Sequence, residues 1–122
     1  MQNQDLEALW SIVFFSPGNL GGNAAVVALE TGRIFGGDSW YYYTGTYETK
    51  TGKLTARVKT THYAGPASSA LMGSLEQGNI EFVEVGRGTD PNGNRTLRLS
   101  GTLIETPTQK VAAELTWRER LP

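Results

Sequence analysis

The side chains best suited to chemistry or binding gather in the run GGDSWYYYTGTYE, residues 36–48. A single aspartate, Asp38, stands there beside a group of large aromatic side chains: Trp40, Tyr41, Tyr42, Tyr43 and Tyr47. Tyrosine rings with polar tips can orient a ligand in a pocket, fill a small core or form a contact surface. Asp38 follows two glycines, so we expect a turn residue whose side chain bonds nearby backbone.

Residues for catalysis or metal binding are sparse. The chain has one histidine, His62, and no cysteine, so a metal site would lack further ligands of suitable spacing. No G-x-S-x-G element is present, and no two of the twelve acidic residues stand out as a buried acid–base pair. We therefore expect no enzyme, no metal and no cofactor. His62 is expected at the end of a strand, with a satisfied hydrogen bond.

Length and composition describe one domain, residues 1–122. A net charge of −1 gives no bulk attraction to phosphate groups, so nucleic-acid binding is not expected. The start, MQNQDLEAL, lacks the basic and apolar regions of a secretory signal. No apolar run approaches the roughly 20 residues that span a bilayer. These features predict a cytoplasmic protein without membrane contact, in which residues 1–7 are disordered.

The elements that position these side chains follow from two-residue alternation, interrupted by turn residues about every ten positions. This pattern predicts eight strands, at residues 9–15, 24–30, 33–37, 40–48, 53–63, 80–85, 95–105 and 110–120. Thr31-Gly32 and Thr51-Gly52 are expected in hairpin turns. Short connections and one apolar face per strand favour an all-β, antiparallel up-and-down barrel of eight strands, with a two-sheet sandwich as the alternative. Residues 64–78 fit a short helix, a plug or a loop.

The barrel places the aromatic run on two faces. One face is expected to point inward together with apolar residues of other strands: Tyr41, Tyr43, Tyr47, Leu54, Val58, Leu99 and Leu115. These residues either fill a core or line a cavity for an apolar ligand. Gly45 lies on the same face and leaves room for a bulky neighbour or a strand bend. Trp40 and Tyr42 are expected on the outer face, where large aromatics are typical of a dimer contact.

The run from residue 9 to residue 48, LWSIVFFSPGNLGGNAAVVALETGRIFGGDSWYYYTGTYE, also carries a resemblance. Its most specific motifs are Leu9-Trp10-Ser11, Gly36-Gly37-Asp38 and Tyr43-Thr44-Gly45, which leads into the hairpin at Gly52. They resemble the GrlR family, negative regulators of type III secretion. The similarity extends over residues 8–63 and returns at Leu99-Ser100-Gly101-Thr102 and in the last strand.

The resemblance implies a lipocalin-like barrel of eight strands, a homodimer and a protein partner, namely a transcriptional activator held in check by binding. In the regulatory branch of that family, an acidic cluster on a surface hairpin is the proposed contact. The matching positions here are Thr49, Lys50, Thr51 and Gly52, so this hairpin is neutral to basic. We expect a non-enzymatic regulator or adaptor that acts through a protein partner. The alternative is a carrier or sensor with a small apolar molecule inside the barrel.

Overall fold

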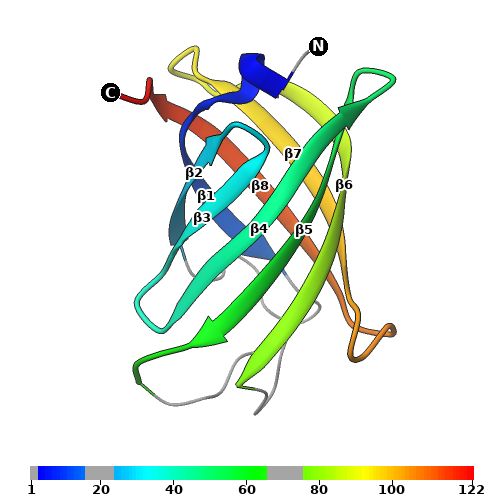
Figure 1. Ribbon diagram of the computed structural model, residues 1–122. Coiled ribbons are helices and arrows are strands. Elements are labelled where there is room, and N and C mark those ends of the chain that lie inside the picture. Colours follow the sequence, from blue (N-terminus) through cyan, green and yellow to red (C-terminus); the bar gives the residue numbers. More distant parts are fainter. Residues whose placement is uncertain (1–2, 16–23, 66–75) are drawn as a thin grey trace.

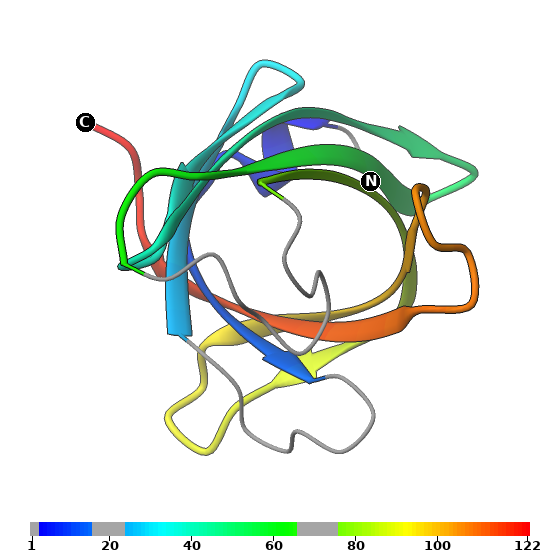
Figure 2. The ribbon, with the colours of Figure 1, turned by 90° about the horizontal axis from the view of Figure 1, so that it is seen from below.

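The computed structural model describes residues 3–15, 24–65 and 76–122. Eight antiparallel strands follow one another around a single closed barrel, as Figure 1 shows from the side and Figure 2 from one end. The strands are β1 (Ala8–Phe15), β2 (Ala24–Glu30), β3 (Arg33–Gly37), β4 (Tyr41–Lys50), β5 (Lys53–His62), β6 (Gln77–Thr89), β7 (Arg95–Leu103) and β8 (Lys110–Glu119).

Closure of the barrel is made by β1 and β8, which pair from Leu9↔Glu119 to Phe15↔Ala112. Every strand of the barrel therefore has a hydrogen-bonded neighbour on both sides. The prediction of an eight-stranded up-and-down barrel is confirmed, and the sandwich alternative is wrong. Most of the ambiguous segment 64–78 lies outside the described residues, since the description stops at Gly65 and resumes at Glu76.

The predicted hairpin turns are present at the upper end of Figure 1. Thr31 and Gly32 have φ values of 52° and 77°, and Thr51 and Gly52 have φ values of 50° and 79°. Two successive residues with positive φ are what a two-residue type I′ turn requires, and its twist matches that of the flanking strands. Glycine at the second position adopts this conformation without steric cost.

Strand β6 runs farther than the predicted range 80–85. Its pairing with β7 shifts register between Glu84 and Gly86, as at a β-bulge, and then continues to Thr89↔Arg95. The bulge breaks the two-residue alternation, and two glycines follow in the extension. The alternation in the sequence therefore ends before the strand does.

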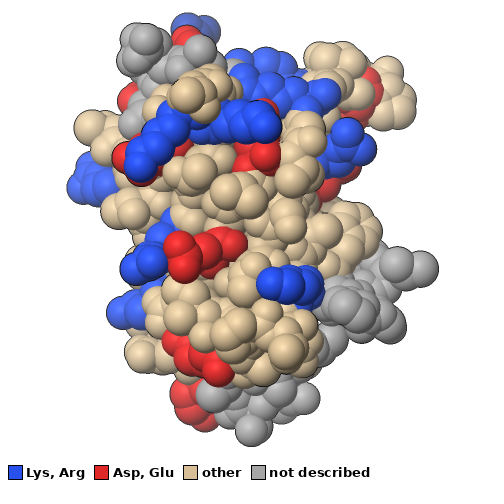
Figure 3. Space-filling model, turned by 90° about the vertical axis from the view of Figure 1, so that its right-hand side faces the viewer, with Lys and Arg blue, Asp and Glu red and all other residues tan. Residues whose placement is uncertain are grey.

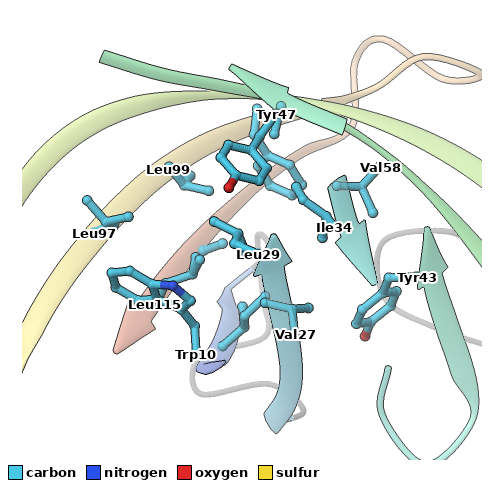
Figure 4. Packing of buried hydrophobic residues seen from close by; sticks show 14 of the residues in the cluster. Trp10, Val27, Leu29, Ile34, Tyr43, Tyr47, Val58, Leu97, Leu99 and Leu115 are labelled. Carbon is cyan, nitrogen blue, oxygen red and sulfur yellow. The ribbon is translucent and has the colours of Figure 1, made fainter. Parts of the chain in front are cut away.

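The core lies inside the barrel, where inward side chains of all eight strands meet (Figure 4). The largest fully buried side chains are Trp10, Leu6, Leu29, Leu54, Leu103 and Val27. Burying a large apolar side chain stabilises a fold by about 1.5–3 kcal/mol. The alternating apolar residues that predict each strand are therefore also the residues that form this core.

Residues 3–6 differ from the expected disorder. They form the short 3-10 helix η1 (Asn3–Leu6), and Leu6 is fully buried. The indole Nε1 of Trp10 donates a hydrogen bond to the Leu6 carbonyl at 2.9 Å, and Arg95 Nη2 donates one to the Asp5 carbonyl at 2.9 Å. A segment of four residues is too short to show the hydrophobic periodicity of a helix in the sequence. Only the tertiary contacts of Leu6 and Asp5 therefore reveal η1. No helix among the described residues is both long and apolar enough to span a bilayer.

Candidate functional site

The seven residues predicted to face inward are all buried in the barrel: Tyr41, Tyr43, Tyr47, Leu54, Val58, Leu99 and Leu115. Figure 4 shows several of them converging from different strands. Their predicted orientation is confirmed, because alternation along a strand is a local property that the barrel preserves. Whether they bind a ligand stays a prediction.

The barrel interior holds a cavity of about 40 Å³. Five of the seven predicted residues line it, among mostly apolar neighbours, whereas Tyr41 and Tyr47 do not. Pockets for small molecules usually measure about 300–1,000 Å³. The cavity is therefore a small void within a packed core, and a ligand of ordinary size would require the interior to expand.

At the lower end of Figure 1, Asp38 organises the turn between β3 and β4. Its Oδ1 accepts hydrogen bonds from the backbone amides of Trp40 and Tyr41, both at 2.8 Å. Its Oδ2 accepts a hydrogen bond from the Tyr43 hydroxyl, and its carbonyl accepts one from the Tyr63 hydroxyl at 2.7 Å. The expectation of a turn residue that bonds nearby backbone is confirmed.

The Tyr43 hydroxyl is held by this turn. Burial, followed by the hydrogen bond to Asp38, raises the pKa of Tyr43 well above its ordinary value. The hydroxyl therefore stays protonated and serves as a donor to the carboxylate. This arrangement stabilises a barrel end.

His62 lies at the same end of the barrel, where β5 stops. Its Nδ1 lies 2.9 Å from Glu76 Oε2, and its Nε2 lies 2.7 Å from the Gly65 carbonyl oxygen. Its ring packs edge-on against Tyr41, with centroids 5.5 Å apart. The predicted strand-end histidine with a satisfied hydrogen bond is confirmed. The sequence carries no signal for the Glu76 contact, which joins residues 14 positions apart.

The buried carboxylate of Glu84 forms an ion pair with Arg87 that the sequence did not indicate. Glu84 points inward from β6 and accepts hydrogen bonds from the Leu54 amide at 3.0 Å and from Arg87 Nη2 at 2.7 Å. Arg87 also donates to the Gly52 carbonyl at 2.9 Å. Burial alone would raise the pKa of Glu84, but the hydrogen bonds from Arg87 and Leu54 outweigh burial and lower it. The pair ties the β4–β5 hairpin to β6.

The outer surface of β1–β4 is the most unusual part of the molecule. Within the described residues of these strands, the outward charged side chains lie in the two hairpins at the upper end: Glu30, Arg33, Glu48 and Lys50. Below the hairpins the outward positions are uncharged. We call five of them the apolar wall: Val13, Val26, Ala28, Phe35 and Tyr42.

The apolar wall crosses the strands as a connected surface. Strand pairing sets Val26 opposite Gly37, and Gly37 opposite Tyr42. The same pairing sets Ala28 opposite Phe35. Val26 on β2, Phe35 on β3 and Tyr42 on β4 are 48%, 41% and 42% exposed, so large apolar side chains face outward on three successive strands.

The two residues predicted at an interface lie at this wall or next to it. Tyr42 belongs to the wall, and its ring lies 6.2 Å from that of Tyr63, measured between centroids. Trp40 is 36% exposed and precedes β4 at the lower end. Their outward orientation is confirmed, and their part in an interface stays a prediction. Tyr63, which the sequence analysis did not single out, extends the aromatic surface.

The opposite side of the barrel, formed by β5–β8, is charged. Its outward positions carry Lys53, Arg57, Lys59, Glu81, Arg98, Lys110, Glu114 and Arg118. Figure 3 shows the side of the molecule on the right of Figure 1, with basic and acidic side chains spread over it. Arg57 and Glu81 pair there at 3.2 Å. Charged side chains are therefore spread along β5–β8, whereas on β1–β4 they are confined to the two upper hairpins.

No group of three acidic or histidine side chains within the described residues is arranged to hold a metal ion. The closed eight-stranded barrel is compatible with the lipocalin-like fold that the resemblance to the GrlR family implies. Membership of that family stays a prediction. No protein-family model matches the chain, and no curated protein matches it in sequence.

Proposed function

We propose that this protein is a non-enzymatic regulator or adaptor that acts through protein contacts on the outside of its barrel. The observation that carries the proposal is the apolar wall on β1–β4, where exposed valine, phenylalanine and tyrosine side chains gather below the charged hairpins. The Arg33 guanidinium of one hairpin lies over the Phe35 ring, 5.8 Å from its centre. Interfaces are enriched in aromatic residues and depleted of charge at their centres. The other half of the barrel surface also exposes Val83 and Val85, but on a strand that carries Glu81 and Arg87.

The occupant that the apolar wall fits best is a second copy of the same chain. A two-fold interface brings each patch against its own copy, so a patch of a single charge sign would be repelled. The apolar wall can meet its copy without such repulsion and without desolvating charged pairs such as Arg57–Glu81 on the other side. Every strand of the closed barrel also has a paired neighbour on each side, and only strand ends such as Glu84–Thr89 of β6 extend beyond the β5 pairing. We therefore expect side chains, rather than sheet extension, to make the contact.

The resemblance to the GrlR family adds a regulatory role, in which the dimer binds and restrains a second protein. In this chain, the hairpin that matches the family's acidic cluster carries an exposed ion pair between Glu48 and Lys50, at 3.2 Å. This charge pattern does not reproduce an acidic contact. The partner proposed here is therefore a protein whose surface differs in charge from the activators bound by that family.

A matched pair of substitutions tests the role of the apolar wall. Val26 on the wall and Val83 on β6 are nearly equally exposed, at 48% and 51%. Val26→Glu should turn a dimer into a monomer, because two carboxylates would be desolvated at the interface. Val83→Glu introduces the same charge on the charged side and should leave the dimer intact. Sedimentation velocity at equal protein concentrations measures both.

Two outcomes would contradict the proposal. A wild-type protein that is monomeric at tens of micromolar concentration lacks the interface altogether. Equal behaviour of the two variants would show that the dimer forms through another surface. Thermal unfolding of each variant serves as the control for folding, since both positions are surface sites where substitutions usually change stability by less than about 0.5 kcal/mol.

The alternative function, a carrier or sensor of a small apolar molecule, has less support. Its requirement is an internal space of a few hundred cubic ångströms. The interior cavity measures about 40 Å³. The carrier function would therefore depend on an expanded form of the barrel.

A further inference from the structure

Both ring nitrogens of His62 face oxygen atoms. The Glu76 carboxylate lies 2.9 Å from Nδ1, and the Gly65 carbonyl lies 2.7 Å from Nε2. A carbonyl oxygen and an ionised carboxylate can only accept hydrogen bonds, whereas a neutral imidazole carries a single N–H donor. Both contacts are satisfied together only when each nitrogen bears a hydrogen. The geometry is therefore that of the charged imidazolium.

Gly65 connects His62 to the predicted interface residue Trp40. The backbone of Gly65 packs on the indole so closely that a β-carbon there would lie 2.8 Å from the Trp40 ring. The Trp40 carbonyl also accepts a hydrogen bond from the Tyr63 amide at 2.9 Å. The segment that follows His62 thus holds both the backbone and the ring of Trp40. Moving Gly65 would change the surface that Trp40 presents.

We infer that self-association of this barrel is linked to protonation of His62, which fixes Gly65 against Trp40 at the edge of the apolar wall. This inference rests on the proposed function and adds its regulation. When His62 loses the proton on Nε2, a lone pair of the ring faces the Gly65 carbonyl and Gly65 must move. Loss of the Nδ1 proton instead displaces the Glu76 carboxylate, which is 69% exposed. The dimer is therefore favoured as the pH falls and weakened as it rises.

The residues around His62 indicate that the expected pH dependence of dimerisation arises from His62. Tyr41 on β4 and Glu76 before β6 are the titratable side chains among the described residues that contact its ring. Asp38 is engaged by Tyr43 and by backbone amides instead. His62 is the sole histidine of the chain, and the chain lacks cysteine. Histidine is the side chain that ordinarily changes charge between pH 5 and pH 8.

The test measures the dimer dissociation constant by sedimentation at pH 6 and at pH 8. We expect the wild-type dimer to be at least about fivefold weaker at pH 8, at the lower end of typical coupling between sites. His62→Gln removes the titrating group, and Glu76→Gln replaces a carboxylate that only accepts with an amide that can also donate to an unprotonated Nδ1. Both should abolish most of this pH dependence. Glu81→Gln, on the charged side of the barrel, should retain the wild-type dependence.

A second readout separates this inference from the proposed function. The indole N–H resonance of Trp40, assigned with Trp40→Phe, should shift with pH together with the His62 ring protons, even in monomeric Val26→Glu. A dissociation constant and a Trp40 chemical shift that are both independent of pH would contradict the link between His62 protonation and dimerisation. That outcome would not contradict the proposed interface. A monomeric wild type would overturn the interface and the linked dimerisation. A moving Trp40 resonance would then support only the contact between Gly65 and Trp40.

Discussion

Glu84 shows how a carboxylate is accommodated inside an apolar barrel. Removing it from water is unfavourable unless its oxygens are hydrogen-bonded. Here Arg87 donates to both carboxylate oxygens, and the Leu54 amide adds a third bond. Arg87 in turn reaches the Gly52 carbonyl. The pair therefore stabilises the junction of the β4–β5 hairpin with β6 through charge-assisted bonds.

Glu84→Gln should lower the free energy of unfolding at pH 7 by about 1–3 kcal/mol, because its amide group would face the donors of Arg87. The native pKa of Glu84 is lowered, so its ionised form stabilises the fold above the unfolded pKa of ~4.3. That contribution is lost as the pH falls through the native pKa. Urea unfolding from pH 7 to pH 3 should show the two proteins converging. A constant difference would contradict this role.

At the scale of elements, the barrel bends where glycine lets neighbouring strands approach. A β-carbon at Gly45 would lie 2.1 Å from the Arg57 carbonyl, and one at Gly36 would lie 2.0 Å from the Val26 carbonyl. Both contacts involve backbone atoms of the adjacent strand, which cannot rotate away. The sequence analysis explained Gly45 by room for a bulky neighbour or a strand bend. The structure identifies that neighbour as the backbone of β5.

Gly45→Ala should destabilise the barrel by at least about 1–3 kcal/mol, because β4 and β5 would have to separate. Gly88→Ala is the matched control, since its β-carbon would meet only the Thr96 hydroxyl at 3.5 Å, an ordinary contact. Denaturant unfolding of both variants measures the difference. If the two substitutions cost the same, the close approach of the strands is not what selects glycine at position 45.

At the scale of the molecule, the outside of the barrel offers more surface for a binding partner than the inside offers space for a ligand. The interior is packed around a cavity of about 40 Å³, whereas the outer surface carries a contiguous apolar wall. Closure of the sheet gives every strand of the barrel a paired neighbour on each side. The proposed partner contact is therefore expected to use the outward side chains of the apolar wall.

Native mass spectrometry measures both the oligomeric state of the protein and the presence of a bound molecule in one experiment. Each chain has a mass of 13.3 kDa, and we expect a dimer of twice that mass without a bound molecule. Extraction with organic solvent before the measurement should leave the mass unchanged. An adduct of a few hundred daltons that extraction removes would favour the carrier function instead, and it would require an interior wider than the one described.

The strands, hairpins and facing of side chains could be predicted because their signals are local. Alternation along β5, for example, places Leu54, Ala56 and Val58 inward whatever the rest of the chain does. Positive φ at Gly32 and Gly52 follows from turn chemistry within a few residues. The expected strand-end position of His62 rests on the same local reasoning.

The sequence by itself thus determined eight strands, their faces and the outward aromatic residues Trp40 and Tyr42. Only the tertiary structure decided that β1 closes on β8, that Glu84 turns inward beside Arg87, and that the cavity is small. These features depend on how side chains from distant strands fill one shared volume and satisfy each other's hydrogen bonds. Local patterns specify the direction of a side chain, but packing decides what it meets there.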